Sequence, residues 1–258
     1  MNPTVPSLLR IAVVSLFALL TDPWVTGAGT TNSPRHGAVI VRDLREIAGW
    51  QVHIDRRLLA TEAEDTARAL AGLKEMLEET ARVVPAPAVA ELKKVPLYVS
   101  TAYRPGQSGA EFHPDAGWLR ANGRDPAMAR GVEFSGVHDF EAERRRMPNF
   151  ALHELAHAYH HRTLPDGFEN AEVKAAYQRA KASGSYERVE RSLGEGNGRP
   201  NTFEQAYAMT NPMEYFAEAT EAYFTRNDFF PFTRDELKRH DPGMFTLLEK
   251  LWGVPATK

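Results

Sequence analysis

Two histidines and a glutamate stand close together at His153-Glu154-Leu155-Ala156-His157 in this chain of 258 residues. On a helix, residues four apart share one face, so the imidazoles of His153 and His157 point toward the same spot. Neutral imidazole nitrogens are good zinc ligands. Glu154 lies about 100° around the helix from His153, where a carboxylate could take a proton from water and pass it to a leaving group. The pentad therefore predicts half of a catalytic metal site.

The alternative for this pentad is a pair of core or surface histidines on an amphipathic helix. The chain has nine histidines, and a chance match is expected in roughly one such chain in fifty. A third ligand is therefore needed to support the metal site. The chain has no cysteine, which excludes Cys-rich zinc sites and leaves His, Asp and Glu as ligands.

A predicted helix over residues 212–225 offers the third ligand. Glu214, Glu218 and Glu221 fall on one face of it, at i, i+4 and i+7. Like charges at this spacing destabilise an isolated helix, a cost that a divalent cation or its histidine ligands would relieve. Two alternatives stay open, because Glu214 could close a capping box with Asn211, and the other two carboxylates could face solvent. Apolar and aromatic neighbours crowd this helix, which favours buried carboxylates with partners.

A family resemblance joins the two motifs. The pentad, followed by Tyr207 and then by Glu214-Tyr215-Phe216-Ala217-Glu218, resembles the gluzincin group that contains anthrax lethal factor and the Mlc titration factor peptidases. Tyr207 stands seven residues before Glu214, as in that group. The stretch from Ala206 to Pro212 looks closer to the titration-factor branch. The resemblance covers roughly residues 149 to 225.

The resemblance implies a zinc-dependent metallopeptidase that holds one Zn²⁺ and hydrolyses a peptide or protein substrate. The roles that it implies are metal ligand for His153, His157 and Glu214, general base for Glu154, hydrogen-bond donor to the oxyanion for Tyr207, and orientation of a ligating imidazole for Glu218. Two other functions stay open. One is a zinc-binding but non-catalytic exported recognition or scaffold protein, and the other is an enzyme with the same machinery acting on a non-peptide amide.

The elements around these motifs predict an α+β chain, with strands first and helices afterwards. The resemblance adds a zincin-like metallopeptidase domain, with a small mixed sheet, long helices and a predominantly helical C-terminal half. We expect strands near residues 49–54, 95–100 and 131–135, and the last as an edge strand that could pair with an extended substrate. We expect helices over residues 61–84 (with a capping box from Thr61 to Glu64), 149–162, 170–182, 212–225 and 233–251. Long loops are expected at 101–125 and 183–200.

The N-terminal residues predict export. An apolar run of about ten residues follows Arg10, too short to span a bilayer, and Thr26-Gly27-Ala28 offers a cleavage site. We therefore assign residues 1–28 to a signal peptide, 29–48 to a flexible lead-in and 49–258 to the metallopeptidase domain. The expected location is secreted or periplasmic, without a stable membrane anchor after cleavage. The net charge of −3, with no long basic run, gives no reason to expect nucleic-acid binding.

Overall fold

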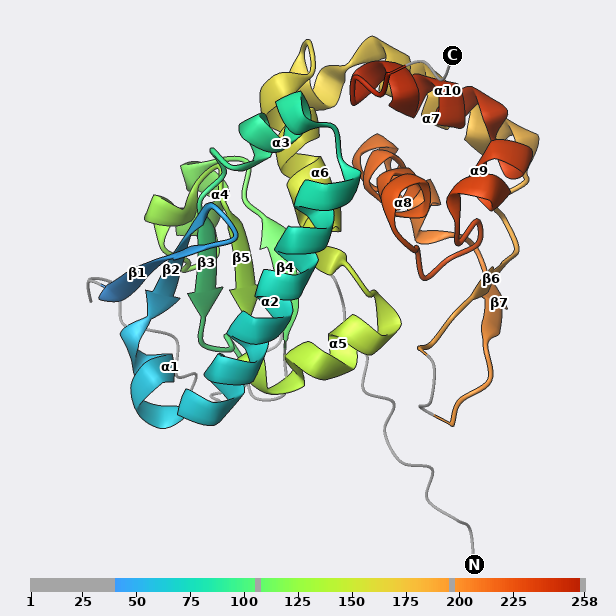
Figure 1. Cartoon of the computed structure of the whole chain (residues 1–258). Helices are drawn as coiled ribbons and strands as arrows, with labels where there is room; N and C mark the ends of the chain where they lie inside the picture. Colours follow the sequence, from blue (N-terminus) through green and yellow to red (C-terminus); the bar gives the residue numbers. More distant parts are fainter. Residues whose placement is uncertain (1–39, 105–107, 195–197, 256–258) are drawn as a thin grey trace, which may run out of the picture.

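The five strands between Arg42 and Ser135 form one mixed sheet (Figure 1). The computed structural model describes residues 40–104, 108–194 and 198–255. The strands lie in the order β1-β2-β3-β5-β4, and only the two outer strands run antiparallel to their neighbours. The strands are β1 (Arg42–Ile47), β2 (Trp50–Asp55), β3 (Leu97–Ser100), β4 (Gly109–Phe112) and β5 (Val132–Ser135).

Helices make up most of the remainder of the described chain. The α-helices are α1 (Arg56–Thr61), α2 (Ala63–Val83), α3 (Ala86–Leu92), α4 (Ala116–Ala121), α5 (Phe140–Arg146), α6 (Phe150–Thr163), α7 (Ala171–Ser183), α8 (Pro212–Phe224), α9 (Arg234–His240) and α10 (Pro242–Leu251). Short 3₁₀ turns are η1 (Pro126–Met128), η2 (Val137–Asp139), η3 (Gly167–Glu169) and η4 (Tyr207–Met209). A small hairpin joins β6 (Val189–Arg191) to β7 (Thr202–Glu204).

The two faces of the sheet are covered differently, because alternate residues of a strand point to opposite faces. On one face, Phe134 of β5 joins a large apolar core with Leu77 of α2 and Leu155 of α6. On the other face, Tyr98 of β3 packs in a small separate cluster with Leu119 of α4. Helix α6 is thus held between the sheet and α8, and α7, α9 and α10 surround α8 on its far side (Figure 1).

The predicted fold class is confirmed: the chain is α+β, with a small mixed sheet and a C-terminal half rich in helices. The predicted edge position of residues 132–135 is wrong, because β5 lies between β3 and β4. The edge strand beside β5 is β4, in a segment for which we expected a loop; that segment also contains α4. A four-residue strand with a glycine carries too little periodicity to be recognised locally.

Several element boundaries also differ from the predictions. Residues 42–47, assigned to a flexible lead-in, form β1, so the folded part begins before residue 49. The predicted capping box at Thr61 is absent: α2 begins at Ala63, and the Thr61 hydroxyl donates to the Arg57 carbonyl at 2.9 Å. The single helix expected over 233–251 is divided at Asp241, whose side chain caps α10.

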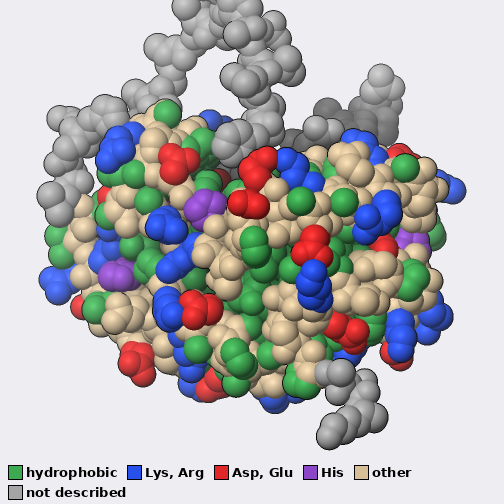
Figure 2. Space-filling model, turned by 90° about the horizontal axis from the view of Figure 1, so that it is seen from above, with side chains coloured by type: hydrophobic (Ala, Val, Ile, Leu, Met, Phe, Trp, Pro, Cys, Tyr) green, Lys and Arg blue, Asp and Glu red, His purple; other side chains and the backbone are tan. Residues whose placement is uncertain are grey.

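The assigned signal peptide, residues 1–28, lies outside the described residues. Within them, no helix combines the length and the apolar character that crossing a membrane requires. On the face of the molecule seen in Figure 2, acidic and basic side chains are interspersed.

Candidate active site

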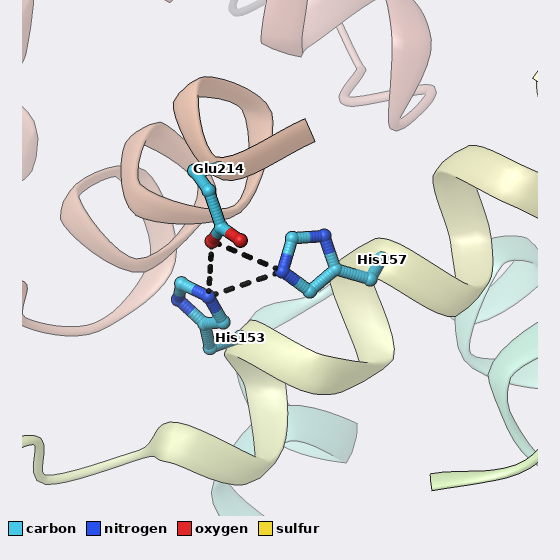
Figure 3. A group of neighbouring side chains, drawn as sticks. All are labelled: His153, His157 and Glu214. Atoms are coloured by element: carbon cyan, nitrogen blue, oxygen red, sulfur yellow. Dashed lines mark hydrogen bonds and ion pairs between the residues drawn. The ribbon is translucent and has the colours of Figure 1, made fainter. Parts of the chain in front are cut away.

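The side chains of His153, His157 and Glu214 converge on one point between α6 and α8 (Figure 3). Nε2 of His153 lies 3.2 Å from Nε2 of His157 and 3.2 Å from Oε2 of Glu214. Nε2 of His157 lies 3.3 Å from the same carboxylate oxygen. All three side chains are buried. The structure thus brings together the three residues that the sequence singles out as ligands.

These spacings fit a zinc ion. Nitrogen and carboxylate ligands lie about 2.0–2.2 Å from zinc, so two ligand atoms of a tetrahedron stand about 3.3–3.5 Å apart. The ligand atoms in the site are 3.2–3.3 Å apart. Oε1 of Glu214 is buried without a hydrogen-bond partner among the described residues. Three ligands leave the fourth position of a tetrahedron open, which is the pattern of catalytic zinc sites.

Asparagine caps place the ligands on their helices. Oδ1 of Asn149 accepts from the amide of Leu152 at 3.0 Å and starts α6 one turn before His153. Oδ1 of Asn211 accepts from the amides of Met213 and Glu214, both at 2.9 Å, and starts α8. The Glu214 side chain does not close a capping box on Asn211 but turns to the two histidines, which settles that alternative.

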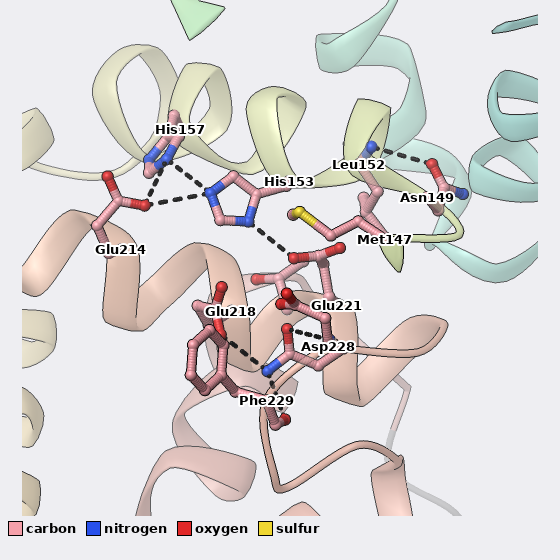
Figure 4. A network of polar contacts seen from close by, with 12 residues as sticks. Met147, Asn149, Leu152, His153, His157, Glu214, Glu218, Glu221, Asp228 and Phe229 are labelled. Carbon is pink, nitrogen blue, oxygen red and sulfur yellow. Dashed lines mark hydrogen bonds and ion pairs between the residues drawn. The ribbon is translucent and has the colours of Figure 1, made fainter. Parts of the chain in front are cut away.

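A second carboxylate holds His153 from behind (Figure 4). Nδ1 of His153 lies 2.7 Å from Oε2 of Glu221, and both side chains are fully buried. A metal ion bound at Nε2 would leave the ring proton on Nδ1, which would then donate to Glu221 and orient the ring. Burial lowers the pKa of His153, but the hydrogen bonds with Glu214 and Glu221 raise it well above its usual value. Burial raises the pKa of Glu221 to about 7, against the effect of His153.

Glu218 does not make the contact with a ligating imidazole that the resemblance implied. Its Oε2 accepts instead from the side-chain amide of Asn227 at 2.9 Å. Burial, followed by the charges of Asp228 and Glu221, raises the pKa of Glu218 well above its usual value. The hydrogen bond expected of Glu218 thus comes from Glu221, one turn further along α8. The spacing predicts that both carboxylates lie on one face of this helix. It does not indicate which of the two contacts His153.

An ion pair behind these carboxylates ties the end of α5 to the segment that follows α8. Arg146, the last residue of α5, pairs with Asp228, which follows α8, and with Glu143 of its own helix. The Asp228 side chain is 1% exposed and also lies 3.4 Å from the guanidinium of Arg191. The Arg146 side chain is only 17% exposed.

Glu154 is positioned by the edge strand of the sheet. Its Oε2 accepts from the backbone amide of Phe112 at 2.8 Å, and the residue is 3% exposed. The contact links α6 to β4 across 42 residues of sequence. It places a carboxylate beside the ligands and next to the free edge of β4. Nothing in the pentad itself indicates this partner.

Residues 134–252 match the model of a family described as glucose-regulated metallo-peptidase M90. This part of the chain resembles a metallopeptidase. The match spans all three candidate ligands and Glu154, and supports peptide hydrolysis by a metal-dependent peptidase. A solved structure similar to the chain is the PRO-PRO endopeptidase (PPEP-2) from Paenibacillus alvei, with 20% identity over 72% of this chain and 90% of that chain and a TM-score of 0.40. No curated protein matches the chain.

Tyr207 and His160 also lie on the elements that form this site. Tyr207 begins η4, which packs against α8, the helix that carries Glu214. His160, two helical turns after His153, is fully buried against Phe216 of α8, and neither ring nitrogen has a hydrogen-bond partner among the described residues. Burial, with the neighbouring histidines, lowers the pKa of His160 to about 3, so this ring is neutral.

Proposed function

We propose that this chain is an exported zinc metallopeptidase of the gluzincin type, holding one zinc ion. The observation that carries the proposal is the triangle of His153, His157 and Glu214 ligand atoms at 3.2–3.3 Å, with a buried carboxylate on the next residue of the helix. The match to a metallopeptidase family over the same residues supports it. A structural zinc site closes with four protein ligands, whereas these three leave room for water. This arrangement favours an enzyme over a non-catalytic scaffold.

When bound, zinc supplies a Lewis acid that lowers the pKa of a water and polarises the scissile carbonyl. Glu154 takes the proton from the attacking water and delivers it to the leaving amine. The Phe112 amide holds one oxygen of Glu154 in place for this transfer, at 2.8 Å. Tyr207 donates a hydrogen bond to the oxyanion, a role that rests on the seven-residue spacing to Glu214.

An extended substrate binds along β4. The amide of Phe112 points away from β5 toward Glu154, so the main-chain groups of Ala110, two residues earlier, also face the open edge. Pairing with these groups brings a peptide bond of the substrate past Glu154 and the ligands. We expected the substrate to pair with residues 132–135, which form β5. We now propose that it pairs with β4 in the same way.

The test combines metal analysis with a peptide-library cleavage assay on the purified chain. We expect one zinc per chain and cleavage in the wild type, and Glu154→Gln to retain the zinc and lose cleavage. Glu214→Ala is expected to lose both. Glu169→Gln, a substitution on an exposed 3₁₀ turn, serves as the matched control and keeps both. A wild-type protein that retains no zinc, or a Glu154→Gln variant that cleaves normally, would refute the proposal.

Export rests on residues 1–28 alone, with their apolar run and small-residue cleavage site. The expected product is a secreted or periplasmic protein that begins near residue 29. Mass spectrometry of the protein recovered from each cell fraction tests this, and an intact N-terminus on cytoplasmic protein contradicts it.

A further inference from the structure

Strand β1 forms one edge of the sheet. Within the described residues, β1 pairs with β2 and with no other strand. The amide of Arg56 donates to the carbonyl of Val41 at 3.1 Å, so Val41 is at a hydrogen-bonded position facing the hairpin partner. Such positions alternate along an antiparallel pair. The main-chain N–H and C=O groups of Arg42, Leu44 and Glu46 therefore point away from the sheet.

This edge combines four charged residues of β1 with two exposed apolar side chains. Leu44 is 57% exposed and Val41 is 54% exposed, and with Phe203 they are the large exposed hydrophobic residues of the described chain. Neither proline nor a bulge interrupts β1, and its register against β2 is continuous from Arg42 to Ile47. Natural edges are commonly protected by such devices or by charged side chains, and β1 carries only the charges. A partner strand that sets opposite charges against them can therefore pair with β1.

The sequence of β1 is complementary to itself when two copies run antiparallel about Leu44. Each acidic residue then meets a basic one, and each apolar residue meets an apolar one, as cross-strand pairs require. The pairs are Leu44 with the partner's Leu44, Asp43 with the partner's Arg45, Arg42 with the partner's Glu46, and Val41 with the partner's Ile47. Moving the twofold axis by one residue along β1, in either direction, brings Asp43 opposite the partner's Asp43 or Arg45 opposite the partner's Arg45.

The hydrogen-bonding pattern agrees with this register. In it, the outward-facing residues Arg42, Leu44 and Glu46 pair among themselves, so each pair can exchange two main-chain hydrogen bonds. The twofold axis passes through Leu44, perpendicular to the sheet, and keeps the helix-covered face of both copies on the same side. Charge pairing rests mainly on Asp43 and Arg45, whose side chains are 37% and 46% exposed. Within one chain these two lie 3.4 Å apart as an ion pair, and in the dimer each exchanges that partner for the one across the axis. Arg42 already binds Asp125 at 2.7 Å, so it contributes less.

We propose that β1 is a self-association surface, on which a second copy of this chain pairs antiparallel about Leu44 to continue the sheet across a twofold axis. The other edge, β4, lies against α6 and beside Glu154, and is left free for substrate. The dimer therefore leaves both candidate active sites open, since they lie at the opposite end of each sheet.

Sedimentation of the purified chain from about 1 µM to about 1 mM tests the proposal. We expect the wild type to approach twice the monomer mass as concentration rises, and Leu44→Lys to stay monomeric with unchanged circular dichroism. Phe203→Lys removes an equally exposed apolar side chain on the β6–β7 hairpin and is expected to dimerise like the wild type. A monomeric wild type, a dimeric Leu44→Lys or a monomeric Phe203→Lys would each overturn the proposal.

Charge reversal tests the register. Asp43→Arg alone places two arginines opposite each other across the twofold axis, and Arg45→Asp alone places two aspartates opposite each other, so each variant is expected to be monomeric. An equal mixture of the two restores an arginine–aspartate pair at both positions of a heterodimer. We therefore expect the mixture to dimerise although neither component does. Single variants that dimerise, or a mixture that stays monomeric, would refute this pairing.

Discussion

Replacing Glu221 by glutamine tests which residue orients His153, the first of the three proposed ligands. Glu221 accepts from Nδ1 of His153 at 2.7 Å, whereas Glu218 is bonded to Asn227 at 2.9 Å. Glutamine keeps the volume and can still accept through its carbonyl oxygen, so the substitution removes charge rather than packing. A hydrogen bond to a charged group contributes about 1.5–3 kcal/mol and one between neutral groups about 0.5–1.5 kcal/mol.

The difference, about 1–1.5 kcal/mol, corresponds to about a tenfold loss of zinc affinity. This agrees with the lower end of the effects known for outer partners of metal-bound histidines, about 10-fold to 100-fold. Glu218→Gln leaves the His153 contact intact, so its expected effect is under about threefold. The two variants are matched in substitution, helix and burial, and only Glu221 is hydrogen-bonded to His153.

Zinc affinity is measured by competition with a chromogenic chelator at pH 8, above the pKa of about 7 for Glu221. Thermal unfolding of each variant without zinc shows whether the fold is intact. If Glu218→Gln weakens zinc binding as much as Glu221→Gln does, Glu221 is not the orienting residue. An unchanged affinity in Glu221→Gln leads to the same conclusion.

The remaining predictions concern catalysis, pH and stability. Tyr207→Phe is expected to lower kcat by about 10²–10³ with zinc content unchanged, as for loss of an oxyanion donor, and steady-state kinetics with metal analysis check this. His160 has a folded pKa of about 3 against an ordinary value of 6.5, so the unfolded chain binds more protons between these values and stability falls as pH decreases through this window. In urea unfolding from pH 7 to pH 5, the wild type is expected to lose about 1–2 kcal/mol more than His160→Gln, and equal slopes would contradict the assignment. Arg146→Met leaves the buried Asp228 carboxylate without its main partner and is expected to lower the free energy of unfolding by about 3 kcal/mol, measured against the exposed control Arg68→Met.

Much of the site could be predicted from local sequence, because helical periodicity is a property of the backbone alone. Four-residue spacing puts His153 and His157 on one face of α6 wherever that helix lies. The same geometry puts Glu214, Glu218 and Glu221 on one face of α8. Asn211 and Pro212 mark the start of that helix through capping and ring geometry, which are also local. The residue types further limited the metal to an ion that histidine and carboxylate can hold.

Only the tertiary structure decided which partner each of the three carboxylates of α8 contacts. The crossing of α8 over α6 places Glu214 beside His153 and His157 and Glu221 behind His153, while Glu218 turns to Asn227. Helix crossing depends on packing between residues some 60 positions apart, for which a single sequence carries no periodic signal. The strand order is decided in the same way, and with it the identity of β4 as the edge. Thus the sequence determined the chemical groups of the site, and the packing of distant segments determined their partners.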